Sequence, residues 1–167
     1  MSRPLRIEFK NAFYHVMNRG SGHRVIFNKD KHYEVFLEIL AEACERFGIE
    51  IHAYCLMSNH YHLLVKTPRA NLSRAMRHIN GVYTQRFNSL SKADGPLFRG
   101  RYKAIIVDSD AYLLQLSKYI HLNPFHAGAV VNLESYQWSS YPAYLKQEES
   151  PDWLFRDLVY EYLTDKK

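Results

Sequence analysis

The stretch LMSNHYHLLVKTP, Leu56–Pro68, decides how the fold is read. Two runs rich in β-forming residues, IEIHAYCLM (49–57) and HYHLLVKTP (60–68), follow each other almost without a break. They meet at Ser58 and Asn59, which are residues that favour turns. The pattern therefore predicts a β-hairpin with a two-residue connection.

The second strand of this hairpin carries two histidines, His60 and His62, one residue apart. Because side chains alternate along a strand, both imidazoles should lie on the same face, roughly 6–7 Å apart. An imidazole in an otherwise apolar strand needs partners for its nitrogens. Two interpretations are open: each ring hydrogen-bonds to a neighbour at the sheet edge, or the pair binds a metal ion. The opposite face of the strand would carry Tyr61, Leu63 and Val65.

The remaining chain reads as a series of extended and helical segments. Apolar residues at helical spacing predict helices, whereas runs of β-forming residues predict strands. In chain order we expect a strand over 12–20, helices over 30–47 and 72–90, a loop running into an extended segment over 95–109, and helices over 110–122 and 152–163.

Several helix ends are marked by residues of suitable chemistry. Gly48 is expected to end the first helix, because glycine readily adopts the left-handed conformation found there. Pro124 should end the helix that begins near residue 110, since proline disfavours a helical conformation at Asn123 before it. The expected N-terminal caps are Asp30 for the first helix, Asn71 or Ser73 for the second, and Asp108 or Ser109 for the third.

The order of these elements is strand, helix, strand, strand, helix, strand, helix. It predicts an α+β fold in which a ferredoxin-like antiparallel sheet is flanked by helices. No linker rich in Gly, Ser or Pro and no internal repeat divides the chain. We therefore expect a single domain over 1–167, with 129–167 as a helical C-terminal extension.

Composition sets the broad class. The 167 residues are 47% hydrophobic and 23% charged, as in an ordinary soluble globular protein. No run of about 18 apolar residues predicts a membrane span, and the charged start MSRPLRIEFK lacks the apolar core of a signal peptide. We expect a cytoplasmic protein with no membrane partner. Cys44 and Cys55 form no disulfide or metal pattern and are interpreted as small buried side chains.

Charge is distributed unevenly along the chain. Residues 66–103 carry nine basic side chains against one acidic, a net charge of +8, whereas 134–167 carry four against seven, a net charge of −3. Six of the nine basic residues are arginines, and aromatic residues lie among them. Arginines interleaved with aromatic rings suit a nucleic acid with unstacked bases. The aromatic residues are Tyr83, Phe87, Phe98 and Tyr102.

The helix predicted over 110–122 carries two tyrosines, Tyr112 and Tyr119, close to one line beside its buried stripe. Asn123 follows Tyr119 by four residues, so its amide oxygen should lie on the same helical face. Either tyrosine could reach a neighbouring strand. Both are candidates for chemistry beside the histidine pair.

Three stretches occur here in a specific order: FYHVMNRGSGHRVIF (13–27), SNHYHLL (58–64) and LFRGRYKAIIVDSDAYLLQLSKYIHLNPFHAG (97–128). Together they resemble the single-tyrosine HUH transposases, and within them the REP-associated tyrosine transposases. The resemblance spans roughly 13–128, most of the chain. It implies a ferredoxin-like fold, recognition of single-stranded DNA with a hairpin, and cleavage by a tyrosine on a helix that becomes linked to a 5′-phosphate.

The resemblance also implies roles for individual residues. His60 and His62 would bind one divalent cation, Mg²⁺ or Mn²⁺, with Asn123 as the third protein ligand where relatives often carry glutamine. Imidazole nitrogens favour Mn²⁺, whereas cellular supply favours Mg²⁺. Tyr119 would be the nucleophile, and Tyr112 is the alternative.

The basic residues acquire a role from the same resemblance. The implied partner is a hairpin of single-stranded DNA, such as a repetitive palindromic element, whose phosphates and unpaired bases would contact basic side chains. Dimeric relatives exchange catalytic helices between subunits, whereas the REP-associated group is expected to act alone, so a monomer is favoured. The candidate DNA-binding residues are Arg19, Arg24, Arg74, Arg77, Arg99, Arg101 and Lys103.

Two other classes of function fit the same residues. The first is a nucleic-acid-binding module of this fold without catalysis. The second is a metal-dependent nuclease that uses water as the nucleophile and forms no covalent intermediate. The extension also has two interpretations: it completes the core, or it shields the DNA groove until substrate arrives.

Overall fold

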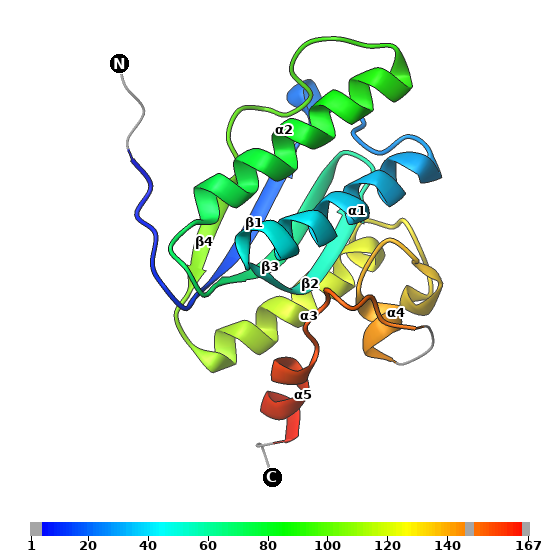
Figure 1. Cartoon of the computed structure of the whole chain (residues 1–167). Coiled ribbons are helices and arrows are strands. Elements are labelled where there is room, and N and C mark those ends of the chain that lie inside the picture. Colours follow the sequence, from blue (N-terminus) through cyan, green and yellow to red (C-terminus); the bar gives the residue numbers. More distant parts are fainter. Residues whose placement is uncertain (1–4, 146–148, 165–167) are drawn as a thin grey trace.

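The fold is built on a four-stranded antiparallel sheet in the order β2-β3-β1-β4, shown by a computed structural model that describes residues 5–145 and 149–164 (Figure 1). Taken with the chain order β1-α1-β2-β3-α2-β4, this is the ferredoxin-like arrangement, so the expected α+β fold is confirmed. The strands are β1 (Ala12–Arg19), β2 (Glu50–Met57), β3 (His60–Thr67) and β4 (Lys103–Val107).

Helices cover both faces of the sheet. The first two helices lie side by side across one face, and the third packs on the other face against β2 and β3 (Figure 1). This is why β2 and β3 are buried along nearly their whole length. The α-helices are α1 (Asp30–Phe47), α2 (Leu72–Ser91), α3 (Asp110–His126), α4 (Tyr141–Tyr144) and α5 (Asp157–Thr164), with short 3-10 turns η1 (Ser21–His23) and η2 (Leu133–Ser135).

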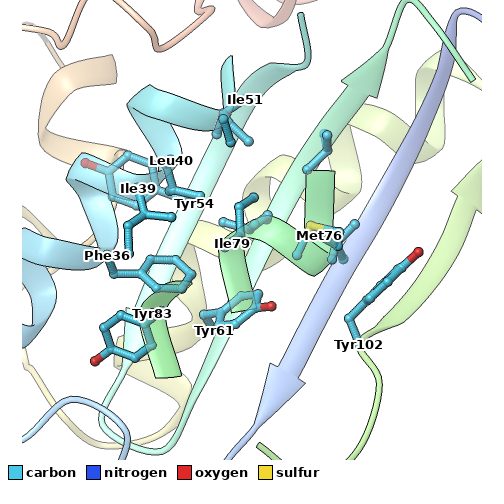
Figure 2. Close-up of a cluster of buried hydrophobic side chains, with 14 of the residues drawn as sticks. Phe36, Ile39, Leu40, Ile51, Tyr54, Tyr61, Met76, Ile79, Tyr83 and Tyr102 are labelled. Atoms are coloured by element: carbon cyan, nitrogen blue, oxygen red, sulfur yellow. The ribbon is translucent and has the colours of Figure 1, made fainter. Parts of the chain in front are cut away.

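The larger part of the core lies between the sheet and the helix pair α1 and α2 (Figure 2). Phe36 and Ile39 of α1 meet Ile79 and Tyr83 of α2 over Tyr61 of β3, and all five are fully buried. The hydroxyl of Tyr61 donates to Oδ1 of Asn80 at 2.6 Å, so the one polar atom of that ring is satisfied. The face of β3 that carries Tyr61 is thereby fixed towards these helices.

A second, smaller core lies on the other face of the sheet. Cys55 and Leu64 from the strands pack with Leu113, Leu116 and Ile120 of α3. Cys55 is buried and unpaired, as expected, whereas Cys44 is unpaired but only half-buried. α3 is thereby held close to β2 and β3.

The C-terminal extension covers the edge of the sheet formed by β2. Backbone hydrogen bonds join Leu56 N to Trp138 O at 2.8 Å and Ser140 N to Tyr54 O at 3.0 Å. Further along, Phe155 N donates to the carbonyl of residue 51 at 2.9 Å. An uncovered edge strand offers unpaired amide and carbonyl groups, and here the extension satisfies several of them. Its position supports the interpretation that it completes the core.

The predicted end of the third long helix is wrong. The helix was expected to stop before Asn123, but α3 continues to His126 with Pro124 inside it. Proline lacks an amide hydrogen, so the carbonyl of Ile120 loses its helical donor, but the Pro124 ring is buried. The left-handed Gly128, with a φ of 72°, follows the actual end.

Two smaller expectations also differ from the structure. Lys29, not Asp30, is the N-cap of α1, and Asp30 is instead an acidic residue in the first turn. The last helix begins at Asp157 rather than near residue 152, because the backbone of 154 and 155 is engaged by β2. Gly48, Asn71 and Ser109 do occupy the helix ends predicted for them, and the Ser109 hydroxyl accepts from Tyr112 N.

In the described part of the chain, none of the helices is long and apolar enough to span a membrane.

The packing of the core predicts that two isoleucines contribute very differently to the free energy of unfolding. Ile79→Ala should lower the free energy of unfolding by about 2–5 kcal/mol, because it leaves a cavity between α2 and the sheet. Ile7→Ala, at a side chain that is 79% exposed, should change it by less than about 0.5 kcal/mol. Urea denaturation of both variants measures the difference. Equal losses would contradict the packing described for α2.

Candidate functional site

The two predicted histidines lie together at the start of β3, on the face that α3 covers. The ring centroids of His60 and His62 are 5.1 Å apart. Each ring has its Nδ1 engaged: that of His60 lies 2.7 Å from Oδ1 of Asn59, and that of His62 lies 2.9 Å from Nε2 of His15. A partner on one ring nitrogen fixes the orientation of the imidazole and leaves its Nε2 for another contact.

α3 brings two more of the predicted side chains to this pair. Nδ2 of Asn123 lies 3.4 Å from Nε2 of His62, and the Asn123 side chain also hydrogen-bonds to His60. One turn earlier, the Tyr119 ring stands edge-on to His62 with the centroids 5.7 Å apart. Tyr119 is 46% exposed, so its hydroxyl-bearing ring is open to a large substrate. The structure therefore brings His60, His62, Tyr119 and Asn123 into one cluster.

His15 of β1 belongs to this cluster and was not predicted. Besides its contact with His62, its ring stands edge-on to Tyr119 with the centroids 6.1 Å apart. Asn18 was also missed: it is buried at the end of β1, and its Nδ2 has no hydrogen-bond partner in the described structure. His15 is a polar residue between apolar neighbours in its strand, whereas Asn18 stands next to Arg19. For His15 this is the same signal that singled out the two predicted histidines.

Burial keeps the clustered imidazoles neutral. It lowers the pKa of His15 to about 4 and, with the nearby rings of His15 and His60, lowers the pKa of His62 to about 3. Burial also lowers the pKa of His60, although a hydrogen bond from its ring to the Asn123 side chain opposes the shift. At neutral pH each ring is therefore uncharged and has one nitrogen without a proton. A neutral imidazole is the form that ligates a metal.

A basic cavity of about 640 Å³ opens beside the histidines. Four of the predicted DNA-binding side chains line it, and it contains no acidic residue. None of these four makes an ion pair with any residue that the structure describes. The four are Arg19, Arg99, Arg101 and Lys103, and the other lining residues are Met17, Asn18, His23, Asn59, His60 and His62.

Gly20 connects the loop that carries Arg99 and Arg101 to the end of β1. Gly20 N donates to Asn59 O at 2.9 Å, and Gly20 pairs with Phe98 in an isolated β-bridge. Next to it, Arg99 N donates to Arg19 O at 2.9 Å. A Cβ at position 20 would lie 2.1 Å from the backbone oxygen of residue 24, so only glycine fits. This crossing holds the arginine-bearing loop beside the His60 end of β3.

The remaining predicted residues lie away from the cavity. Arg24 donates to Pro96 O at 3.4 Å, near the far end of α2. Arg77 lines a second cavity, of about 800 Å³, along α2, and Arg74 lines neither. Tyr112 is half-buried and packs into the smaller core, so it is not beside the histidines.

The residues present fit a divalent cation. Among residues 5–145 and 149–164, no group of three or more His, Cys, Asp or Glu side chains is arranged to hold a metal. A site here would therefore use the two neutral imidazoles of His60 and His62 with the amide of Asn123, which already meets both rings. Few protein ligands and several open positions are typical of sites where Mg²⁺ or Mn²⁺ also binds a phosphate.

Comparison of the sequence with known families identifies the family of this protein. A family profile described as "Transposase IS200 like" matches residues 8–123, more than half of the chain. The protein belongs to the IS200-like transposase family, which confirms the resemblance seen in its motifs. It is similar to a Haemophilus influenzae protein assigned as a REP-associated tyrosine transposase, with 24% identity over 130 residues, 71% of this chain and 74% of the relative.

Solved structures show the same fold. A REP-associated tyrosine transposase bound to a REP hairpin superimposes with a TM-score of 0.72 and 16% identity, over 95% of this chain and 93% of that one. A Deinococcus radiodurans protein assigned as a transposase gives a TM-score of 0.50 and 20% identity, over 71% of this chain and 95% of that one. The first match includes most of the C-terminal extension.

The buried imidazoles predict a pH dependence in the protein without added metal. His15 and His62 should stay neutral from pH 8 to pH 5 in long-range ¹H–¹⁵N NMR spectra, because burial holds their pKa values at about 4 and about 3. In the urea-unfolded chain the same rings should titrate near pH 6.5.

The sign of the stability change follows from this difference. Only the unfolded chain takes up these protons as the pH falls from about 6.5 towards 4, so the free energy of unfolding should decrease over that range. Above about pH 6.5 this contribution is fully present. Titration of either ring above pH 6 in the folded protein would contradict the buried arrangement.

Proposed function

We propose that this protein is a metal-dependent endonuclease and strand transferase for single-stranded DNA, which cleaves beside hairpin repeats through a 5′-phosphotyrosine intermediate. One observation carries the proposal: Tyr119 and Asn123, one turn apart on α3, face His60 and His62 of β3. Family membership supports it, because it makes phosphoryl transfer on DNA the expected reaction. We expect the protein to act as a monomer that supplies all four side chains itself.

The histidine pair and Asn123 would hold Mg²⁺ or Mn²⁺ through their Nε2 atoms and the amide oxygen. When bound, the cation would neutralise charge on the scissile phosphate. For this, Asn123 must present its oxygen rather than the NH₂ group that now faces His62, which needs only a rotation of the amide. Asn59 and His15 would keep the two rings oriented.

Tyr119 would supply the nucleophile. Its oxygen attacks the phosphorus and loses its proton, a bond from phosphorus to Tyr119 forms, and the bond from phosphorus to the 3′ oxygen breaks. That oxygen takes up a proton and leaves as a free 3′-hydroxyl. Since one phosphodiester replaces another, the reverse step can join a new strand without ATP. The exposure of Tyr119 gives a phosphodiester access to the ring.

The basic cavity would hold the DNA next to this reaction. Arg19, Arg99, Arg101 and Lys103 present four cations that have no acidic partner among the described residues, and phosphate oxygens are their natural ligands. A solved relative with this fold binds a REP hairpin, which supports a hairpin as the substrate here. We expect the strand to pass from this cavity over His60 and His62 to Tyr119.

The proposal is tested by trapping the intermediate. Purified protein, Mn²⁺ and a labelled single-stranded hairpin from repeats near the gene should give an adduct on a denaturing protein gel that carries only the label 3′ of the break. Tyr119→Phe should lower its yield by at least about 10³-fold, because the nucleophilic oxygen is gone. Tyr112→Phe, on the same helix, should leave the yield within about twofold.

Other outcomes separate the alternatives. Cut DNA without an adduct would indicate a nuclease that uses water. Hairpin binding without cutting, unchanged by Tyr119→Phe, would indicate a binding module.

The candidate DNA-binding residues differ in position, because some line the basic cavity and others do not, and this difference gives a second prediction. Arg101→Ala should weaken hairpin binding and reduce the slope of log Kd against log salt concentration by about 1, since one phosphate contact is lost. Arg74→Ala removes the same charge outside both cavities and should change Kd by less than about twofold. Fluorescence anisotropy over a salt series measures both. Equal effects would show that the basic charge acts diffusely and not through the cavity.

A further inference from the structure

α3 must present Tyr119 and Asn123 towards β3, but its apolar residues do not define that orientation well. Leu113, Leu116 and Ile120 are buried, and further apolar side chains lie around the rest of the helix. A helix whose apolar side chains extend beyond its buried stripe gains similar burial at several rotations about its axis. One residue of slippage turns the helix by about 100° and would take Tyr119 away from the histidines.

A buried polar contact lies on the side of α3 opposite to Tyr119 and Asn123. His121 lies between Tyr119 and Asn123 in the sequence, so it points to the opposite side of α3. Its Nε2 lies 2.6 Å from Oγ of Ser140, and both side chains are buried. Among residues of α3, His121 and Ser117 are the buried polar side chains in the described structure.

Ser140 is itself held rigidly on the edge of the sheet. Its backbone N donates to Tyr54 O at 3.0 Å, and its Oγ accepts from Tyr54 N at 3.0 Å. The hydroxyl thus joins three elements: β2, the C-terminal extension and α3. Tyr144, from α4 of the extension, packs beside the His121 ring with the centroids 5.1 Å apart and donates to the carbonyl of residue 52.

α3 needs such an anchor at this place. Pro124 leaves the carbonyl of Ile120 without its helical donor, so the backbone is weakened between Tyr119 and Asn123. The His121–Ser140 contact lies in the middle of that turn. It supplies a specific bond where the helix has lost one.

We propose that His121 is a positioning residue, and that its bond to Ser140 sets the rotation of α3 so that Tyr119 and Asn123 face the histidine pair. This proposal rests on the proposed function for the role of Tyr119. The C-terminal extension then has a part in catalysis without touching DNA. No residue of its described part lines the basic cavity, in agreement with such an indirect role.

The experiment compares three variants of the full chain. His121→Leu removes the bond and keeps a buried apolar volume, His121→Gln keeps a polar nitrogen or oxygen near the position of Nε2, and Ser140→Ala removes the hydroxyl partner. His32→Leu is the matched control, because His32 is also a buried, hydrogen-bonded histidine but caps α1 and packs on Phe87 of α2, not on α3. Each variant is assayed for single-turnover adduct formation, hairpin Kd and hydrogen exchange of α3 amides.

The expected results separate positioning from general stability. His121→Leu and Ser140→Ala should each slow adduct formation by about 10–100-fold with hairpin Kd within about twofold, and the double variant should be no slower than the worse single one. His121→Gln should recover to within about threefold of the wild type. His32→Leu should lower stability but leave the rate for folded protein unchanged.

Amide exchange reports on the anchor even if no adduct forms. Exchange over 119–126 should rise at least about tenfold in His121→Leu and Ser140→Ala, and by less than about threefold in His121→Gln. If the wild type forms no adduct, the proposed function fails, and the anchor is judged on exchange alone. Wild-type exchange of α3 in His121→Leu, or adduct formation at the wild-type rate, would overturn the proposal.

Discussion

The rest of the structure depends on the two-residue alternation of β3. One face of the strand places Tyr61, Leu63 and Val65 in the large core under α1 and α2. The other face is then committed to α3, where it presents His60 and His62. A slip of one residue in the register would bury the imidazoles among aromatic rings and turn the core residues towards α3, so the fold and the site are specified together.

The candidate site combines buried, neutral imidazoles with exposed basic side chains that line a cavity. His15 and His62 are desolvated and satisfy each other, whereas Arg99, Arg101 and Lys103 stay exposed and unpaired in the described structure. The first arrangement gives fixed lone pairs at one place, and the second gives long-range attraction for a polyanion. Phosphoryl transfer on DNA needs both, because the phosphate must be attracted and then held in one orientation.

Much of this was predictable from the sequence because it follows from local periodicity. Alternation placed His60 and His62 on one face, and helical spacing placed Asn123 one turn after Tyr119. The family, and the ferredoxin-like order of strands, are confirmed by comparison and by the structure. The roles of these four residues stay predictions.

The rest depends on contacts between residues far apart in the chain. His15 is 47 residues from His62, and no local pattern gives the register in which β1 pairs with β3. The extension was expected as a helical segment that completes the core or shields the DNA groove, but the sequence did not predict that its backbone pairs with β2 and that Ser140 meets α3. Pro124 was expected to end α3, because a local preference cannot include the packing that outweighs it.

The most direct test of this account is the identity of the residue that carries the DNA. The wild-type adduct, trapped on a hairpin with Mn²⁺ and digested with protease and nuclease, would be mapped by tandem mass spectrometry. The account predicts a nucleotide joined through its 5′-phosphate to Tyr119, in the peptide that also contains Asn123. Attachment to Tyr112 or to any other residue, or products with free 5′-phosphates and no modified peptide, would contradict it.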